Sequence, residues 1–451
     1  MYDEAYARPG LARPHYAALL RELDRADLVE LQEQVADWVC VHGVTFADEP
    51  FAVDPVPRVL TAQEWRDIEA GLVQRVRALN AFVRDVHGPR VIVEEGVVPP
   101  VLMVSADHHE PAMAGMAEHG ANPIAVAGLD VVRDADGRFL VLEDNLRTPS
   151  GFAYAVAARQ ASEVLLSQHH PLRDVECAFD LFGDALRAAA PDGVEDPFVV
   201  VVSDGPANPA WYEHRVVAER LGLPLVGVDD LEVDDGALVV DVDEERHRVD
   251  VVYRRTNEER RIDDEGRPTA IGAALLEPLR RGLLGCANAF GAGVADDKLA
   301  HAYVERMIAF YLGEEPLVRS VPTFDLADPA AREEVLDRID EMVIKPRAQS
   351  GGHGVVVGPH AGAEDRERTI RAVEADPEAF VAQETVWLSR HPTVVDGRLE
   401  PRHVDLRAFV FVSADGAVAL PGGLTRVALD AGALVVNSSQ NGGAKDTWVL
   451  A

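Results

Sequence analysis

The stretch at 128–151, GLDVVRDADGRFLVLEDNLRTPSG, decides how the fold is interpreted. Alternating apolar and polar residues flank an Ala-Asp-Gly turn signal at 135–137. Residues 122–145 are therefore predicted to form a β-hairpin.

The end of this hairpin carries a group of oxygen ligands. Glu143 and Asn145 are two residues apart, so both point to one face of a strand, and Asp130 on the partner strand is a candidate for the same face. Two carboxylates and an amide carbonyl suit Mg²⁺ rather than zinc. The alternative is a solvated acidic strand edge in a chain that is rich in acids.

A lysine and a glycine loop follow a strand at 343–355, VIKPRAQSGGHGV. Glycines allow backbone N–H groups to approach phosphate oxygens closely, and Lys345 adds a point charge. GxxxxGK[ST] is absent, so this is not a Walker A loop. The alternative is a structural glycine-rich hairpin.

Two weaker signals lie further along the chain. The strand FVAQETV at 380–386 could set backbone groups and an acid against adenine and ribose, or be an ordinary strand end. Arg407 lies in an apolar strand and needs an anionic partner, either Asp405 on the same face or a transferred phosphoryl group. Arg426 and the polar tail at 437–446 add further cationic and polar side chains to this set of candidate residues.

Composition narrows the class of protein. The 451 residues are 47% hydrophobic and 27% charged, which is typical of a soluble chain with two or three folding units. The net charge of −34 opposes binding to nucleic acid and to anionic membranes, but not binding of a nucleotide in a local cationic pocket. Three dispersed cysteines, no long apolar run and no apolar segment at the N-terminus favour the cytoplasm.

The basic residues are almost all arginine. Lys298, Lys345 and Lys445 are the only lysines among 43 basic residues. Each lies beside one of the motifs, which favours roles that need a compact ammonium, although three lysines could also remain by chance.

Periodicity divides the rest of the chain. Residues 12–90 are predicted to be mostly helical around an extended connection at 42–60, and 152–190 return to helix. Residues 195–255 alternate strands with a helix, as in a small α/β unit. A helix is expected at 297–312, and an α+β region rich in antiparallel strands follows from 341. His301 is assigned to packing or surface.

Together these segments resemble the circularly permuted branch of the ATP-grasp superfamily, type 2, over roughly residues 1–450. The hairpin is similar to the metal-binding end of an ATP-grasp domain, which comes first here instead of last. DDKLAHAYV at 296–304 and VIKPRAQSGGHGVVV at 343–357 are similar to the two nucleotide-binding lysine segments, and FVAQETV resembles the adenine-hinge strand. Eukaryotic-type glutathione synthetase shares this order, but it has a metal-binding glutamate where Gln349 stands.

The resemblance implies an ATP- and Mg²⁺-dependent ligase that converts a carboxylate to an acyl phosphate and then to an amide. The implied residues are Asp130, Glu143 and Asn145 for the metal; Lys298, Lys345, Ser350, Gly351, Gly352, Gly354, Gln383, Glu384 and Val386 for ATP; Arg407, Arg426, Arg147 and Lys445 for catalysis; and Arg147, Arg254 and Asn441 for substrate. The alternatives are an ATP-dependent phosphotransferase acting on a small molecule and a catalytically silent ATP-grasp scaffold. Small-molecule or peptide carboxylates and amines are the expected partners, with homo-oligomers as an option, and the sequence names neither the acid nor the amine.

The expected fold class is multidomain α/β and α+β. It comprises a helical N-terminal region at 1–120, the metal-binding part of the ATP-grasp core at 121–190, a Rossmann-like pre-ATP-grasp domain at 191–290, and the nucleotide-binding subdomains at 291–451. The permuted order predicts that strand 138–145 lies in one antiparallel sheet with 403–412. It also predicts that Arg147 points toward the acyl acceptor and that the α/β unit at 195–255 forms the far wall of the cleft.

Overall fold

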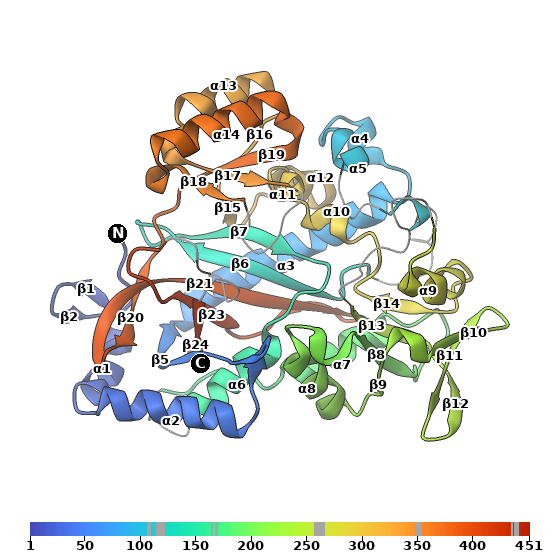
Figure 1. The fold of residues 1–451 in the computed structure, drawn as a ribbon, viewed down its shortest axis with the longest axis horizontal. Helices are drawn as coiled ribbons and strands as arrows, with labels where there is room; N and C mark the ends of the chain where they lie inside the picture. The colour runs from blue at the N-terminus through green and yellow to red at the C-terminus, as the bar shows by residue number, and fades with distance from the viewer. Residues whose placement is uncertain are drawn as a thin grey trace.

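Three β-sheets of four or more strands organise the described part of the molecule (Figure 1). The computed structural model describes residues 1–105, 110–113, 122–163, 166, 170–256, 267–347, 354–433, 436 and 442–451. A large central sheet lies in the middle of Figure 1, a parallel sheet lies below and to its right, and a small antiparallel sheet lies above it.

The central sheet has the strand order β15-β7-β6-β21-β23-β24-β5, with β20 and β22 paired to β21. Its strands are β5 (Val53–Leu60), β6 (Val126–Arg133), β7 (Phe139–Asn145), β15 (Arg319–Ser320), β20 (Arg390–Val395), β21 (Arg398–Ser413), β22 (Gly416–Ala419), β23 (Leu424–Ala428) and β24 (Gly442–Val449). Since β21 pairs with β6 and β6 with β7, the shared sheet predicted for strands 138–145 and 403–412 is confirmed.

The predicted hairpin of β6 and β7 is also confirmed, and its turn has a local cause. The Asp134 side chain accepts hydrogen bonds from the backbone N–H groups of Asp136 and Arg138, both at 2.9 Å. Gly137 has a φ of 87°, a conformation that favours glycine. The turn sets the register of Val131 opposite Val141, and an irregularity of one residue beyond that pair then brings Asp130 opposite Glu143.

Side-chain alternation gives the central sheet two buried faces. Leu129 and Leu406 pack on one face with α3 (Ala62–Val86) and α12 (Val304–Leu312). Phe409 and Phe411 pack on the other with α6 (Phe152–Glu163) and α7 (Ala178–Ala188). Burial of apolar surface on both faces fixes the sheet between two helical layers.

The parallel sheet forms the predicted α/β unit. Its order is β14-β13-β8-β9, with β8 (Val199–Ser203), β9 (Leu225–Val226), β13 (Val251–Arg255) and β14 (Gly285–Ala287). Helix α8 (Trp211–Leu221) and helix α9 (Ala270–Arg280) pack on it, within separate hydrophobic clusters. The predicted strand ALVVDV is β11 (Ala237–Val242), but it pairs in a separate antiparallel sheet with β10 (Leu231–Asp234) and β12 (Glu245–Arg248).

The third sheet carries the lysine strand. Its order is β16-β19-β17-β18, with β16 (Thr323–Asp325), β17 (Met342–Pro346), β18 (Val356–Val357) and β19 (Phe380–Glu384). Helices α13 (Pro329–Asp337) and α14 (Ala363–Ala375) cover it (Figure 1). The single helix expected at 297–312 is instead α11 (Lys298–His301) followed by α12, with α10 (Gly293–Asp296) before them.

The N-terminal region differs from the expectation. It contains α1 (Ala17–Leu23), α2 (Leu28–Val41) and α3, together with short α4 (Val91–Glu94) and α5 (Val101–Ser105). However, the expected extended connection ends in β5, which pairs in parallel with β24 in the central sheet. The region therefore contributes a strand to the central sheet as well as helices, and the domain boundaries at 120, 190 and 290 stay predictions.

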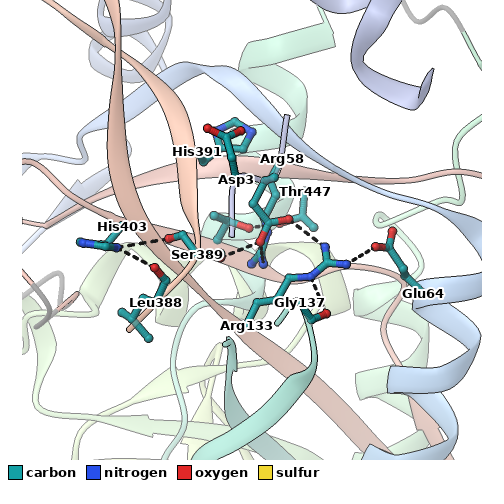
Figure 2. A network of polar contacts seen from close by, with 12 residues as sticks. Asp3, Arg58, Glu64, Arg133, Gly137, Leu388, Ser389, His391, His403 and Thr447 are labelled. Atoms are coloured by element: carbon teal, nitrogen blue, oxygen red, sulfur yellow. Dashed lines mark hydrogen bonds and ion pairs between the residues drawn. The ribbon is translucent and has the colours of Figure 1, made fainter. Parts of the chain in front are cut away.

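A buried ionic network ties the first residues to this sheet (Figure 2). The fully buried carboxylate of Glu4 accepts hydrogen bonds from Arg58 at 2.6 Å, Arg133 at 3.1 Å and Ser389 at 2.7 Å. Arg133 also pairs with Glu64, at the start of α3. Buried charges persist only when they are paired in this way, so the network fixes β5, β6 and the segment before β20 together.

Candidate nucleotide and metal site

A pocket lies between β7 of the central sheet and the strands β17 and β19 of the third sheet. Its described lining residues are Leu142, Glu143, Asp144, Asp296, Asp297, Lys298, His301, Lys345, Val381 and Gln383. The structure thus brings together four residues that the sequence predicted from separate motifs, namely Glu143, Lys298, Lys345 and Gln383. The Gln383 side-chain N–H donates to the Leu142 carbonyl at 3.2 Å, which links the two sheets directly.

The two lysines give the pocket its positive charge. Lys345 projects from β17, and burial lowers its pKa, while the nearby Glu143 carboxylate opposes that shift. The positive charge of Lys298 also lowers the pKa of Lys345. The Lys298 ammonium donates to the Arg347 carbonyl at 3.4 Å. Two ammonium groups close enough to affect one another favour an anionic ligand between them.

Two adjacent aspartates hold the two sides of this pocket. Asp296 accepts hydrogen bonds from the backbone N–H groups of Leu146 at 2.6 Å and Arg147 at 3.1 Å, which fixes the turn after β7. Asp297 accepts two from the Arg347 guanidinium, at 3.1 and 2.9 Å, which fixes the end of β17. The Arg147 guanidinium, predicted to reach an acyl acceptor, lies 3.2 Å from Asp296. Its role toward a substrate stays a prediction.

Glu143 and Asn145 share one face of β7, as predicted, because they alternate with Asp144. No group of three or more histidine, cysteine, aspartate or glutamate side chains arranged to hold a metal occurs in the described part of the chain. The buried amide nitrogen of Asn145 has no hydrogen-bond partner there. A carboxylate and an amide oxygen fit Mg²⁺, which is commonly held by one or two protein oxygens together with substrate phosphates.

Asp130, a predicted metal ligand, pairs with two arginines in the structure. Its carboxylate accepts from Arg407 at 2.8 and 2.9 Å, and one oxygen also lies 2.9 Å from Arg426. Burial alone raises the pKa of Asp130, but the two guanidinium groups outweigh burial and bring it to about 2. Because both oxygens hold arginines, Asp130 orients these two cations, and its role as a metal ligand stays a prediction. Asp405, one of the two alternatives considered as partner of Arg407, pairs with Arg426.

The remaining predicted nucleotide residues are not all in this pocket. Glu384 follows Gln383 on the strand and lies 3.6 Å from Arg338, and Val386 packs in a separate hydrophobic cluster. Gly354 has a φ of 70° just before β18. Ser350, Gly351, Gly352 and Asn441 lie outside the described residues, as does Gln349. Their roles stay predictions.

His301 is a pocket residue that the sequence did not identify. The buried Asp144 carboxylate binds Arg75 through two hydrogen bonds, at 2.6 and 2.7 Å, and lies 2.8 Å from His301 Nδ1. Burial lowers the pKa of His301, and the charges of Arg75 and Lys345 lower it further. His301 is buried, in agreement with the expected packing role, and it also lines the pocket, which the sequence could not indicate because neither Arg75 nor Asp144 is near His301 in sequence.

The α/β unit contacts the segment after β7 through Arg255, not Arg254. The Arg255 guanidinium donates to the carbonyls of Thr148 at 2.8 Å and Pro149 at 3.2 Å. Arg254 alternates with it on β13 and lies 4.7 Å from the Phe290 ring centroid. Two of its guanidinium nitrogens are buried with no hydrogen-bond partner among the described residues.

Lys445 is a structural residue, which corrects its prediction as a catalytic group. Its side chain is fully buried on β24, paired with Asp54 of β5, and donates to the Pro392 carbonyl at 3.2 Å. It is aligned with Thr425, so it lies on the opposite face of the sheet from Arg426. This ammonium therefore stabilises the sheet and does not reach the pocket.

Two sheets that face each other across a pocket of lysines and carboxylates define a protein of the ATP-grasp class. Residues 57–428 match the family described as circularly permuted ATP-grasp type 2. The chain belongs to this family, as the motif order indicated.

Relatives in several bacteria match nearly the whole chain. A Frankia alni protein named "Putative glutamate--cysteine ligase 2-3" is 43% identical over 468 residues, which cover 99% of this chain and 54% of that protein. Uncharacterized proteins of Synechocystis sp. and Mycobacterium tuberculosis are 38% and 39% identical, covering all of this chain and 97% and 84% of their own lengths. The chain spans about half the length of the Frankia proteins it matches.

The described residues include no helix with both the length and the apolar character of a membrane span.

Proposed function

We propose that this protein is an ATP- and Mg²⁺-dependent ligase that joins a carboxylate to an amine through an acyl phosphate. The observation that carries the proposal is the meeting of Glu143, Lys298 and Lys345 in one pocket, from three separate segments of the chain. Family membership and the name of the Frankia relative support it.

Different pocket residues bind the phosphates and the metal ion of Mg·ATP. Lys298 and Lys345 bind the phosphates of ATP, and Glu143 and Asn145 hold Mg²⁺ at the end of β7. The metal, when bound, neutralises charge on the phosphates that are transferred and released. Asp296 holds the turn after β7 and Asp297 holds the end of β17, so a change in one aspartate moves the ligands on its own side of the ATP.

Arg407 and Arg426 differ in their access to a substrate. The Arg407 side chain is 18% exposed and is held by Asp130, whereas Arg426 is 7% exposed between Asp130 and Asp405. Arg407 is therefore the group that contacts the transferred phosphoryl group and the acyl phosphate. Arg426 acts as a positioning residue, because its donors already hold two carboxylates.

The α/β unit supplies the far wall and binds the acid. We assign it as the Rossmann-like pre-ATP-grasp domain, with Arg255 docking it against the residues that follow β7. Arg254 and Arg147 are the candidate carboxylate-binding groups, because a guanidinium binds a carboxylate through two parallel hydrogen bonds.

The reaction can be tested by product analysis. The purified chain is incubated with Mg·ATP and pairs of acids and amines, beginning with glutamate and cysteine, and ADP, phosphate and amide are measured. An acid labelled with ¹⁸O in its carboxylate should transfer one labelled oxygen to the released phosphate, because the acyl phosphate retains that oxygen when the amine displaces the phosphate.

Each outcome separates one reaction class. Amide, ADP and labelled phosphate that appear only when the amine is supplied support the ligase. A stable phosphorylated acceptor without amine identifies a phosphotransferase, and release of AMP and pyrophosphate contradicts the acyl-phosphate route. No turnover with any pair, despite ATP binding, favours a silent scaffold.

A further inference from the structure

The segment that connects β7 to α6 is held through its backbone by side chains of the α/β unit. The Arg255 guanidinium donates to the carbonyls of Thr148 and Pro149. The Glu213 carboxylate of α8 accepts from two backbone N–H groups at the start of α6, at 2.8 and 3.0 Å. Buried backbone groups need such partners, so these contacts fix the course of the chain. The α/β unit therefore sets where the residues just after the proposed metal ligands lie.

Asn288 makes the contact that lies nearest to those ligands in the sequence. It is buried directly after β14. Its Oδ1 accepts from the backbone N–H groups of Ala125 at 2.8 Å and Val126 at 2.9 Å. Its Nδ2 donates to the carbonyls of Val126 at 2.6 Å and Leu146 at 2.8 Å. The two donors and the acceptor oxygen of the amide are thus all used. One side chain joins the start of β6 to the residue after Asn145.

The position of Asn145 depends on this backbone contact. The amide nitrogen of Asn145 is buried and has no hydrogen-bond partner among the described residues. The backbone of Leu146 is instead held at both polar groups, because its carbonyl accepts from Asn288 and its N–H donates to Asp296 at 2.6 Å. A metal ligand must be held within about 0.5 Å of its productive position. Loss of the Asn288 contact should therefore displace Asn145 relative to Glu143.

A short chain of polar groups orients Arg255. Its Nε donates to His214 Nε2 at 3.0 Å, and His214 Nδ1 lies 2.8 Å from Ser203 Oγ. A guanidinium can only donate, so Nε2 accepts and Nδ1 carries the proton that it donates to the serine. Burial, together with the charge of Arg255, lowers the pKa of His214 to about 2, so the ring stays neutral. Groups on β8 and α8 therefore aim the remaining guanidinium nitrogens at the segment after β7.

We propose that Asn288 and Arg255 are positioning residues for the metal site: from the α/β unit, they hold the end of β7 where Asn145 binds Mg²⁺. The affinity for Mg²⁺ then depends on these two residues. The affinity for the nucleotide phosphates does not, because the two pocket lysines belong to α11 and β17. This inference rests on the proposed use of Mg·ATP, and it adds residues outside the pocket that set the metal affinity.

Calorimetric titration of the purified chain separates the two affinities. ATP binding in EDTA reports on the lysines, and the Mg²⁺ concentration that gives half of the maximal gain in ATP affinity reports on the metal site. Asn288→Ala should raise this half-effective Mg²⁺ concentration roughly 10-fold or more, as loss of a group that orients a ligand commonly does. Arg255→Lys keeps the charge but loses the planar fork, so it should raise it roughly 3- to 10-fold. ATP binding in EDTA should stay unchanged in both variants.

Asn80→Ala is the matched control for Asn288→Ala. Asn80 is also buried and also holds the residue before β6, because it accepts from the Ile124 N–H at 2.9 Å and donates to the Ile124 carbonyl at 3.2 Å. These hydrogen bonds come from α3 and do not involve β7. Asn80→Ala should therefore lower the free energy of unfolding without changing the half-effective Mg²⁺ concentration.

Arg246→Lys is the control for Arg255→Lys. Arg246 lies on β12, is 44% exposed and pairs with Glu232 at 2.8 Å, so its substitution should change neither affinity.

The outcomes are distinct. An unchanged half-effective Mg²⁺ concentration in Arg255→Lys, or in a folded Asn288→Ala, overturns the inference and leaves the ligase proposal intact. Equal weakening of ATP binding with and without Mg²⁺ also overturns it, because a general loss of structure gives that pattern. A rise of the same size in Asn80→Ala has the same consequence. If Asn288→Ala does not fold, Arg255→Lys decides the question alone. Failure of the wild type to bind ATP under either condition removes the proposed function itself.

Discussion

Asp130→Asn is the substitution that best separates the two roles considered for Asp130. The amide keeps the shape of the side chain but removes the charge that holds Arg407 and Arg426. If Asp130 anchors the arginines, the substitution should lower the stability of the fold and disturb the position of Arg407. If Asp130 is a metal ligand, the substitution should instead raise the Mg²⁺ concentration that the reaction requires.

The expected magnitude follows from the contacts of the carboxylate. A pKa of about 2 in the fold, against an ordinary 3.8, corresponds to about 2 kcal/mol in favour of the ionised form. Breaking a buried ion pair costs about 3–5 kcal/mol, and partial exposure of Arg407 reduces this figure. We therefore expect Asp130→Asn to lower the free energy of unfolding by about 2–4 kcal/mol at pH 7.

The loss should depend on pH in a defined direction. Because the pKa of Asp130 is lower in the folded state, the unfolded state binds more protons below about pH 4. The contribution of the carboxylate is fully present above that range and is lost as the pH falls toward 2. The difference between wild type and Asp130→Asn should therefore shrink over the same interval.

Urea denaturation at several pH values measures these differences in the free energy of unfolding, provided that the slope of that free energy against urea concentration is the same in wild type and variant. Glu334→Gln is the control, because its pair with Arg338 is 3.0 Å long but 53% and 39% exposed, and it should cost less than about 1 kcal/mol. Asp130→Asn combined with Arg407→Met should recover part of the loss, since it removes the uncompensated cation.

The reasoning on Asp130 is refuted if Asp130→Asn changes stability no more than Glu334→Gln does. It is also refuted if the half-saturating Mg²⁺ concentration rises about 10-fold or more at unchanged stability, which would restore Asp130 as a metal ligand.

Two further predictions concern the pocket itself. Glu143→Gln should abolish Mg²⁺-dependent turnover without unfolding the protein, because no described ion pair depends on this carboxylate. A turnover assay and calorimetric titration with Mg·ATP test this prediction. A wild-type rate in the variant would contradict the metal assignment. Lys345→Ala should weaken ATP binding roughly 10-fold or more, as expected for a lost charged hydrogen bond. Lys345→Arg should not restore it fully, because a guanidinium is bulkier than the ammonium beside Lys298; unchanged affinity in both variants would make the strand purely structural.

The local elements of this fold could be read from the sequence. The hairpin at 126–145 follows from alternation and a glycine turn, and the parallel strands at 199–203 and 251–255 follow from short apolar runs. Placement of Glu143 and Asn145 on one face needed only the two-residue period of a strand. The order of the motifs was enough to indicate the family.

Elements with weak local signals were misread. β5 contains two prolines and appeared to be a connection, but its pairing with β24 makes it a strand of the central sheet. The helix expected at 297–312 breaks between α11 and α12. β5 is a strand because it pairs with a strand that is distant in sequence, and local periodicity does not encode such pairing.

Only the tertiary structure decided which charged groups face each other. Asp130 was assigned to the metal because it lies on the strand paired with that of Glu143, and Lys445 was assigned to catalysis because it lies in the polar tail. In the structure, Asp130 holds two arginines and Lys445 is buried against Asp54 on the opposite face of the sheet. Conversely, His301 entered the site through Asp144, which is 157 residues away. The local sequence sets the face on which a side chain lies, but its partner and its pKa depend on strands and helices brought together by folding. The sequence therefore determined the class of protein, and the packing of the sheets determined the chemistry of each charged residue.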